Sequence, residues 1–120
     1  MPRIFAVQSE NCCPFSKAVE NDSTALPEII TSPTLAEGIA IAEPMRFDEI
    51  MGYIRKYRVQ VITAPENMIS EAQAQLAEQG IFCELTTAAT YAAYLHYCKF
   101  HGPLTDVLLP MCGAGLKSMH

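Results

Sequence analysis

Short apolar runs rich in branched and aromatic residues alternate along this chain with segments of helical periodicity. Strands are predicted at residues 3–7, 59–63 and 107–111, with a brief extended piece at 81–83. Helices are predicted at residues 14–21, from Pro44 through Ile54, at 66–79, and from Thr86 or Thr87 up to Gly102. Because strands that alternate with helices in this way usually form layers, the sequence predicts a three-layer α/β fold with a mostly parallel sheet.

Proline, glycine and threonine mark the expected ends of the helices. Pro14 fits the first turn of a helix, where its missing N–H has no partner in any case. Gly80 stands at the C-terminal cap position of the third predicted helix. Thr86 or Thr87 is the expected N-cap of the last helix. Residues 21–33 have no sustained period and are expected to form a loop.

The length and charge of the chain limit the classes of protein it can belong to. With 120 residues, 50% of them hydrophobic, the chain is expected to fold as a single α/β domain over residues 1–120. Its net charge is -5, and the 8 basic residues are scattered, so we expect neither nucleic acid nor an anionic membrane surface as a partner. No apolar stretch approaches the roughly 20 residues that cross a bilayer.

The cysteines favour a reducing environment. There are five, two of them adjacent, and none forms a C-x-x-C pair. Since disulfide frameworks use even numbers at regular spacing, we expect a soluble cytoplasmic protein whose cysteines are mostly small core residues.

Two segments carry residue types suited to ligand binding at the carboxyl ends of strands. Residues 111–115 contain two glycines that let the backbone approach a ligand closely, and residues 84–89 contain a carboxylate and two hydroxyls. Each segment could hold a phosphate or the edge of a planar cofactor. The alternatives are a tight turn at the glycines, an N-cap at the threonines and a solvated carboxylate at Glu84.

Metal and nucleophile patterns are weak. His96 and His101 do not share a helix face, and no cysteine stands at zinc-ligand spacing, so no metal site is predicted. Cys98 and His101 have i, i+3 spacing but no group that would orient the histidine. No catalytic residue is therefore assigned.

Taken in order, four segments resemble a known family. They are residues 2–8 (PRIFAVQ), 34–39 (TLAEGI), 80–89 (GIFCELTTAA) and 112–117 (CGAGLK). Together they are similar to the C-terminal third of the fold-type II pyridoxal-phosphate enzymes, which share the tryptophan synthase beta-like fold. Within this superfamily the chain most resembles threonine synthase, and the threonine and serine dehydratases share the same order of motifs.

The resemblance implies a cofactor site at the carboxyl ends of a parallel sheet. Cys112 matches the position of a Ser, Thr or Cys beside the pyridine nitrogen of pyridoxal phosphate, and Gly38 matches a glycine near the cofactor ring. Glu84 matches a glutamate close behind the ring, and Gly113 and Gly115 match the closing glycines. A neutral partner at Cys112 would favour elimination over transamination.

Three positions depart from the family pattern. Leu85 replaces a proline, and Ala114 stands where threonine synthases often have His or Ser. Gln8 occupies a position where relatives that bind a divalent ion carry a glutamate, so no metal is carried over.

The Schiff-base lysine and the Gly-rich phosphate loop of the family have no counterpart here. None of the lysines, Lys17, Lys56, Lys99 and Lys117, lies in a Ser-x-Lys segment, and Met1 resembles a start within a longer enzyme. We therefore expect the C-terminal part of a threonine synthase-like enzyme that acts on small amino-acid substrates, is inactive alone and forms a homo-oligomer. The alternatives are a threonine or serine ammonia-lyase of the same superfamily, or a small non-catalytic α/β module that binds a ligand or partner.

Overall fold

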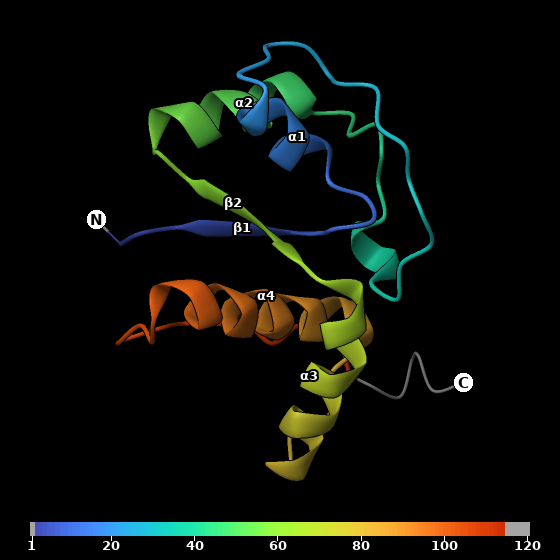
Figure 1. Ribbon diagram of the computed structural model, residues 1–120, viewed down its shortest axis with the longest axis vertical. Coiled ribbons are helices and arrows are strands. Elements are labelled where there is room, and N and C mark those ends of the chain that lie inside the picture. Colours follow the sequence, from blue (N-terminus) through green and yellow to red (C-terminus); the bar gives the residue numbers. More distant parts are fainter. Residues whose placement is uncertain (1, 115–120) are drawn as a thin grey trace.

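Two parallel strands form the centre of the fold, and helices cover both faces (Figure 1). The computed structural model describes residues 2–114. In chain order the elements are β1 (Phe5–Ser9), α1 (Pro14–Glu20), the 3₁₀ turn η1 (Glu37–Ile39), α2 (Phe47–Lys56), β2 (Gln60–Ala64), α3 (Glu66–Glu78) and α4 (Leu85–His101). The predicted three-layer α/β fold with a parallel sheet is confirmed.

The register of the sheet explains the two layers of helices. β1 and β2 pair in parallel, with Ala6 opposite Val61 and Val7 opposite Ile62. Because successive side chains of a strand point to opposite faces, Val61 packs on the side of α1 and α2, whereas Val7 and Ile62 pack on the side of α3 and α4.

Each face of the sheet has its own hydrophobic core. On the α1 and α2 side, the buried residues are Ala18, Phe47, Met51 and Ile54. The core on the other side contains many alanines, and its buried residues are Ala36, Ala64, Ile69, Ala72, Leu76, Cys83, Ala88, Ala89, Ala92 and Ala93. Such small side chains let α3, α4 and β2 approach one another closely. No helix within residues 2–114 combines the length and apolar composition needed to span a membrane.

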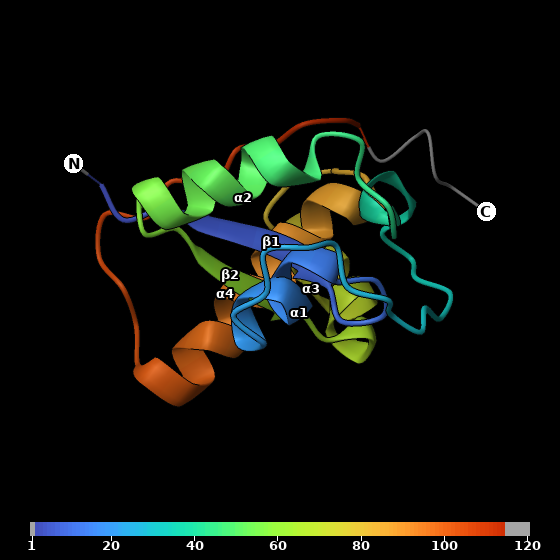
Figure 2. The ribbon, with the colours of Figure 1, turned by 90° about the horizontal axis from the view of Figure 1, so that it is seen from above.

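The carboxyl ends of both strands lie on the same side of the molecule as the start of α4 and the η1 turn (Figures 1 and 2). This follows from the direction of α4, which runs back along the sheet against the direction of the strands. In open α/β sheets, ligands bind at this edge.

The predicted N-caps of the last helix are wrong. α4 begins at Leu85, so Thr86 and Thr87 lie inside its first turn, and the cap position belongs to Glu84. The backbone of Glu84 is extended, and its carbonyl accepts the Ala88 N–H at 3.0 Å. The threonine hydroxyls are thereby free to bond other segments.

The strand predicted at residues 107–111 is also wrong. This segment and β1 both line a groove of about 550 Å³. Among the described residues, no backbone hydrogen bond joins the segment to β1. Pro110 has no N–H to donate to such a ladder. The extended pairing in this part of the chain is instead a single antiparallel bridge between Cys83 and Ala114.

Candidate functional site

The four residues predicted for the cofactor site, Gly38, Glu84, Cys112 and Gly113, all contact the beginning of α4 or belong to it. Glu84 is the N-cap of this helix. Gly38 comes to it from η1, and Cys112 and Gly113 come from the segment that follows Pro110. The structure therefore brings together residues that are up to 75 positions apart in the sequence (113 minus 38).

Gly38 packs directly on the hydroxyl of Thr86. The Gly38 N–H donates to Thr86 Oγ1 at 3.0 Å. A Cβ atom at position 38 would lie 2.9 Å from the same oxygen and 3.1 Å from Thr86 Cγ2. This contact leaves no room for a larger residue unless Thr86 moves.

Gly113 contacts Glu84 through its backbone, in a conformation that favours glycine. Its carbonyl accepts the Glu84 N–H at 3.2 Å, and its φ of 76° is in the left-handed region that favours glycine. A Cβ atom at position 113 would lie 2.3 Å from Glu84 Cδ. The Glu84 side chain is half-buried and lies over the Gly113 backbone, so it differs from the fully solvated carboxylate of the alternative interpretation.

Cys112 is anchored through its backbone and presents its thiol to solvent. The hydroxyl of the buried Thr87 donates a hydrogen bond to the Cys112 carbonyl. The thiol itself belongs to an exposed residue. Thr86 and Thr87 thus have specific partners that sequence spacing did not indicate, because their expected role was helix capping.

The other cysteines differ in their surroundings. Cys12, Cys13 and Cys83 are buried, and burial raises the pKa of each thiol above its ordinary value. At neutral pH these thiols are protonated and shielded from reagents. Cys98 is half-buried, and Cys112 is the exposed cysteine of the described residues.

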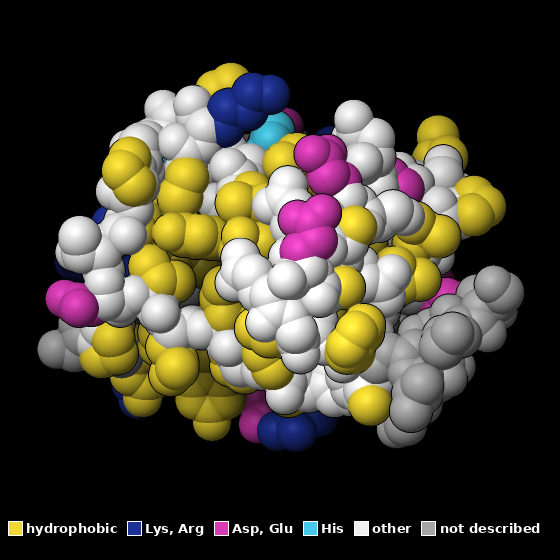
Figure 3. Space-filling view, turned by 90° about the horizontal axis from the view of Figure 1, so that it is seen from below, with side chains coloured by type: hydrophobic (Ala, Val, Ile, Leu, Met, Phe, Trp, Pro, Cys, Tyr) yellow, Lys and Arg dark blue, Asp and Glu magenta, His cyan; other side chains and the backbone are white. Residues whose placement is uncertain are grey.

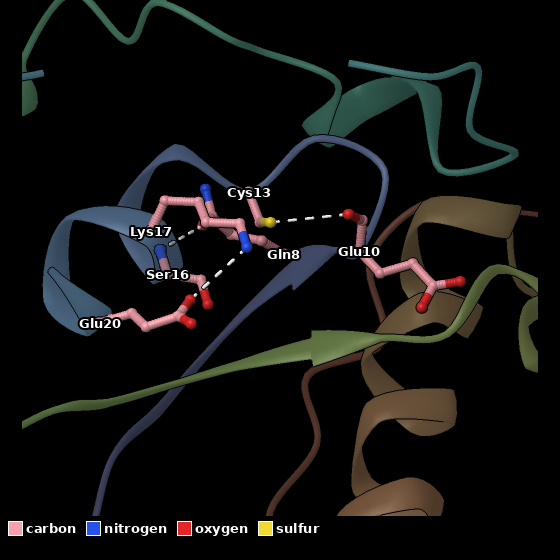
Figure 4. Close-up of polar contacts among 6 residues, drawn as sticks. All are labelled: Gln8, Glu10, Cys13, Ser16, Lys17 and Glu20. Atoms are coloured by element: carbon pink, nitrogen blue, oxygen red, sulfur yellow. Dashed lines mark hydrogen bonds and ion pairs between the residues drawn. The ribbon is translucent and has the colours of Figure 1, made fainter. Parts of the chain in front are cut away.

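Gln8 is used to join β1 to α1. Its side-chain carbonyl accepts the N–H of Ser16 at 3.0 Å, close to the contact of the Cys13 thiol with the Glu10 carbonyl (Figure 4). Within residues 2–114, no group of three or more His, Cys, Asp or Glu side chains is placed to share a metal ion.

The lysines of the described chain lie away from this site. Lys17 is on α1, on the opposite face of the sheet, where it pairs with Glu20 at 3.5 Å (Figure 4). Lys56 is the last residue of α2. Lys99 follows Thr86 by 13 positions on α4, a distance of about 20 Å along the helix axis. Two residues of the predicted motif, Gly115 and Lys117, lie outside the described residues.

Backbone and one exposed cysteine are what the predicted cofactor residues bring to the start of α4. At Gly38 and Gly113 the space for a Cβ atom is occupied by the side chains of Thr86 and Glu84, and Cys112 is exposed nearby. Peptide backbone and a thiol are groups that can line the face and the edge of an aromatic ring. A covalent link to a lysine is not among the functions that these residues can supply.

This α/β scaffold brings Gly38 and Gly113 together at the carboxyl ends of its parallel strands. The family of pyridoxal-phosphate dependent enzymes matches the sequence over residues 1–113, and the chain belongs to this family. No curated protein matches the sequence significantly.

The Gly113→Ala substitution tests the contact with Glu84. We expect it to lower the free energy of unfolding by at least about 1 kcal/mol more than Gly80→Ala. Gly80 is the matched control because it has a similar φ of 84° with no atom within 4 Å of an added Cβ. Urea unfolding of both variants measures the difference. In a Glu84→Ala background, the extra loss at position 113 should disappear; equal losses in both backgrounds would contradict the contact.

Thiol labelling tests the surroundings of the cysteines. At pH 8 we expect Cys112 to react with a small alkylating reagent about a hundredfold faster than Cys12, Cys13 and Cys83, because burial restricts access and the raised pKa keeps these thiols protonated. Mass spectrometry of peptides gives the rate at each site. Cys112→Ser should remove the fast phase, and a buried cysteine that reacts at the same rate as Cys112 would refute the assignment.

Proposed function

We propose that this chain is the C-terminal part of a threonine synthase-like enzyme and that it builds one wall of the pyridoxal-phosphate site. The observation that carries this proposal is the convergence of Gly38, Glu84, Cys112 and Gly113 on the first turn of α4. These are the residues for which the family resemblance implies a cofactor role. The family match supports the cofactor class.

Each residue of the wall has a proposed part. Cys112 would be the partner of the pyridine nitrogen, since the family resemblance implies a Ser, Thr or Cys at this position and the residue is exposed. Gly38 and Gly113 would contribute their backbone to the wall, held there by Thr86 and Glu84, whose side chains occupy the space that a Cβ atom would need. When bound, pyridoxal phosphate supplies the electron sink for elimination and replacement on amino acids.

The chain alone is proposed to be inactive. Neither a lysine nor a phosphate-binding loop accompanies the wall in residues 2–114. A complete enzyme would therefore need a lysine-bearing segment from elsewhere, and its substrates would be small amino acids such as O-phosphohomoserine. We also propose a cytoplasmic location, for which the free cysteines are the support.

The activity assay compares two reactions. The chain alone is expected to release neither phosphate from O-phosphohomoserine nor 2-oxobutyrate from threonine in the presence of pyridoxal phosphate. A protein that joins this chain to its lysine-bearing segment should release phosphate, and Cys112→Ala should reduce that rate at least about tenfold while Cys98→Ala leaves it unchanged. Release of 2-oxobutyrate instead would identify an ammonia-lyase. Turnover by the chain alone would refute the division of the site.

We also propose that the chain self-associates. In the described residues the outer edge of β1 has no strand partner, and an unpaired edge tends to recruit another chain. Apolar side chains gather on the side of the molecule where α3 and α4 lie (Figure 3). Phe82, Phe100 and Leu108 are 73%, 70% and 88% exposed.

Sedimentation velocity over a range of concentrations tests self-association. We expect a dimer or larger species whose population grows with concentration, because burying exposed apolar surface is favourable. Leu108→Asp should shift the distribution toward monomer, and Glu28→Gln, an exposed change elsewhere on the chain, serves as the control. A wild-type monomer even at millimolar concentration would exclude the proposed assembly.

A further inference from the structure

The carboxylate of Glu66, the first residue of α3, accepts hydrogen bonds from three donors. The hydroxyl of Ser9 donates to Oε2 at 3.1 Å and the hydroxyl of Thr34 donates to the same oxygen at 2.8 Å. The backbone N–H of Leu35 donates to Oε1. Both oxygens of one side chain are therefore occupied, in a residue that has no part in the predicted site.

These hydrogen bonds join three segments that are far apart in the sequence. Ser9 is the last residue of β1 and is fully buried, and Thr34 and Leu35 belong to the long loop before η1. Hydrogen bonds to a carboxyl group from three donors restrict the positions of the segments that carry the donors. The Glu66 carboxylate thus ties the loop to the carboxyl edge of the sheet.

Further hydrogen bonds connect Thr34 to the turn that contains Gly38. Thr34 Oγ1 also accepts the Ala36 N–H at 3.1 Å, and Ala36 is fully buried in the core. The Ala36 carbonyl accepts the Ile39 N–H at 3.1 Å, which closes the η1 turn that contains Gly38. Gly38 then reaches Thr86 on α4. Hydrogen bonds and the backbone of the η1 turn together therefore connect Glu66 to the start of α4.

Glu66 is itself held in place. The carboxylate of Glu10 accepts the Glu66 N–H at 2.7 Å, and Ser9 Oγ accepts the Asn11 N–H at 3.1 Å. The beginning of α3 and the end of β1 are therefore fixed to each other on both sides of the Glu66 carboxylate. An anchored acceptor can determine the position of the loop.

We propose that Glu66 is a positioning residue that fixes residues 34–39, which include Gly38, against the first turn of α4. Its importance for the cofactor rests on the proposed function, in which Gly38 faces the ring. Glu66 acts through the loop and does not touch the cofactor. The requirement is for two acceptor oxygens, because three donors converge on them; glutamine offers only one.

Hydrogen exchange of backbone amides tests the proposal. In Glu66→Ala, the amides of Leu35, Ala36 and Gly38 should exchange about tenfold faster, whereas those of Ala92 and Ala93 in the middle of α4 should not change. Glu71→Ala is the matched control, because Glu71 is an exposed glutamate of the same helix. Unchanged exchange at Gly38 in Glu66→Ala would overturn the proposal.

A second variant separates the loop contact from the stability of α3. Thr34→Val keeps Glu66 and its bond to Leu35 but removes the hydroxyl that links Glu66 to Ala36. In this variant we expect faster exchange at Ala36 and Gly38 and unchanged exchange at Leu35. The measurement on Thr34→Val can be made even if Glu66→Ala does not fold. If Gly38 exchange does not respond to Thr34→Val, the tie does not run through Thr34 and the proposal fails.

Addition of pyridoxal phosphate distinguishes this inference from the proposed function. A change in the chemical shift of the Gly38 amide in the wild-type chain, reduced in Glu66→Ala, supports both. Faster Gly38 exchange in Glu66→Ala without any shift change in the wild type supports the positioning role and counts against a cofactor wall formed by this chain. A shift change in the wild type together with unchanged Gly38 exchange in Glu66→Ala supports the wall and overturns the role of Glu66.

Discussion

The close packing of α4 on the parallel strands is the contact on which the rest of the structure depends. Ala88, Ala89, Ala92 and Ala93 are buried, and their small side chains bring the helix close to β2 and α3. Because α4 runs against the direction of the strands, its first turn lies at their carboxyl ends (Figure 1). The η1 turn and the segment after Pro110 both make their polar contacts with this turn. A larger residue in the alanine face would displace the helix and with it every part of the candidate site.

The sequence predicts the helices of this fold better than its strands and caps. Pro14, Gly80 and Gly102 act on the backbone locally, so the ends that they predict agree with α1, α3 and α4 to within one or two residues. A strand needs a partner as well as a pattern. Residues 107–111 have the composition of a strand but no hydrogen-bonded neighbour among the described residues, and β1 extends to Ser9, two positions beyond the apolar run. The capping role of Thr86 and Thr87 was wrong because the helix starts earlier, at Leu85.

The residues in and around the candidate site also fall into those that the sequence indicates and those that it does not. Gly38, Glu84, Cys112 and Gly113 were predicted from a family pattern, and the structure places them together. Their assignment to a cofactor remains a prediction. The tie formed by Glu66 could not be found in this way, because Ser9 and Thr34 are separated from Glu66 by 57 and 32 positions. No periodicity relates residues so far apart. A glutamate at the start of a helix is also explained by the helix dipole alone, which conceals its second role.

The contacts of the proposed wall are formed within this chain. Thr86 holds Gly38, Thr87 holds Cys112, and the backbone of Glu84 holds Gly113. A wall that is already in place loses little conformational entropy when a ring binds to it, so it can contribute affinity and orientation. Among the described residues the wall contains no lysine, and Lys99 is about 20 Å along α4 from Thr86. Recognition of the ring and covalent attachment would then reside in different segments of the enzyme. In the proposed enzyme, a change in this wall would alter the orientation of the cofactor and leave its attachment to the lysine intact.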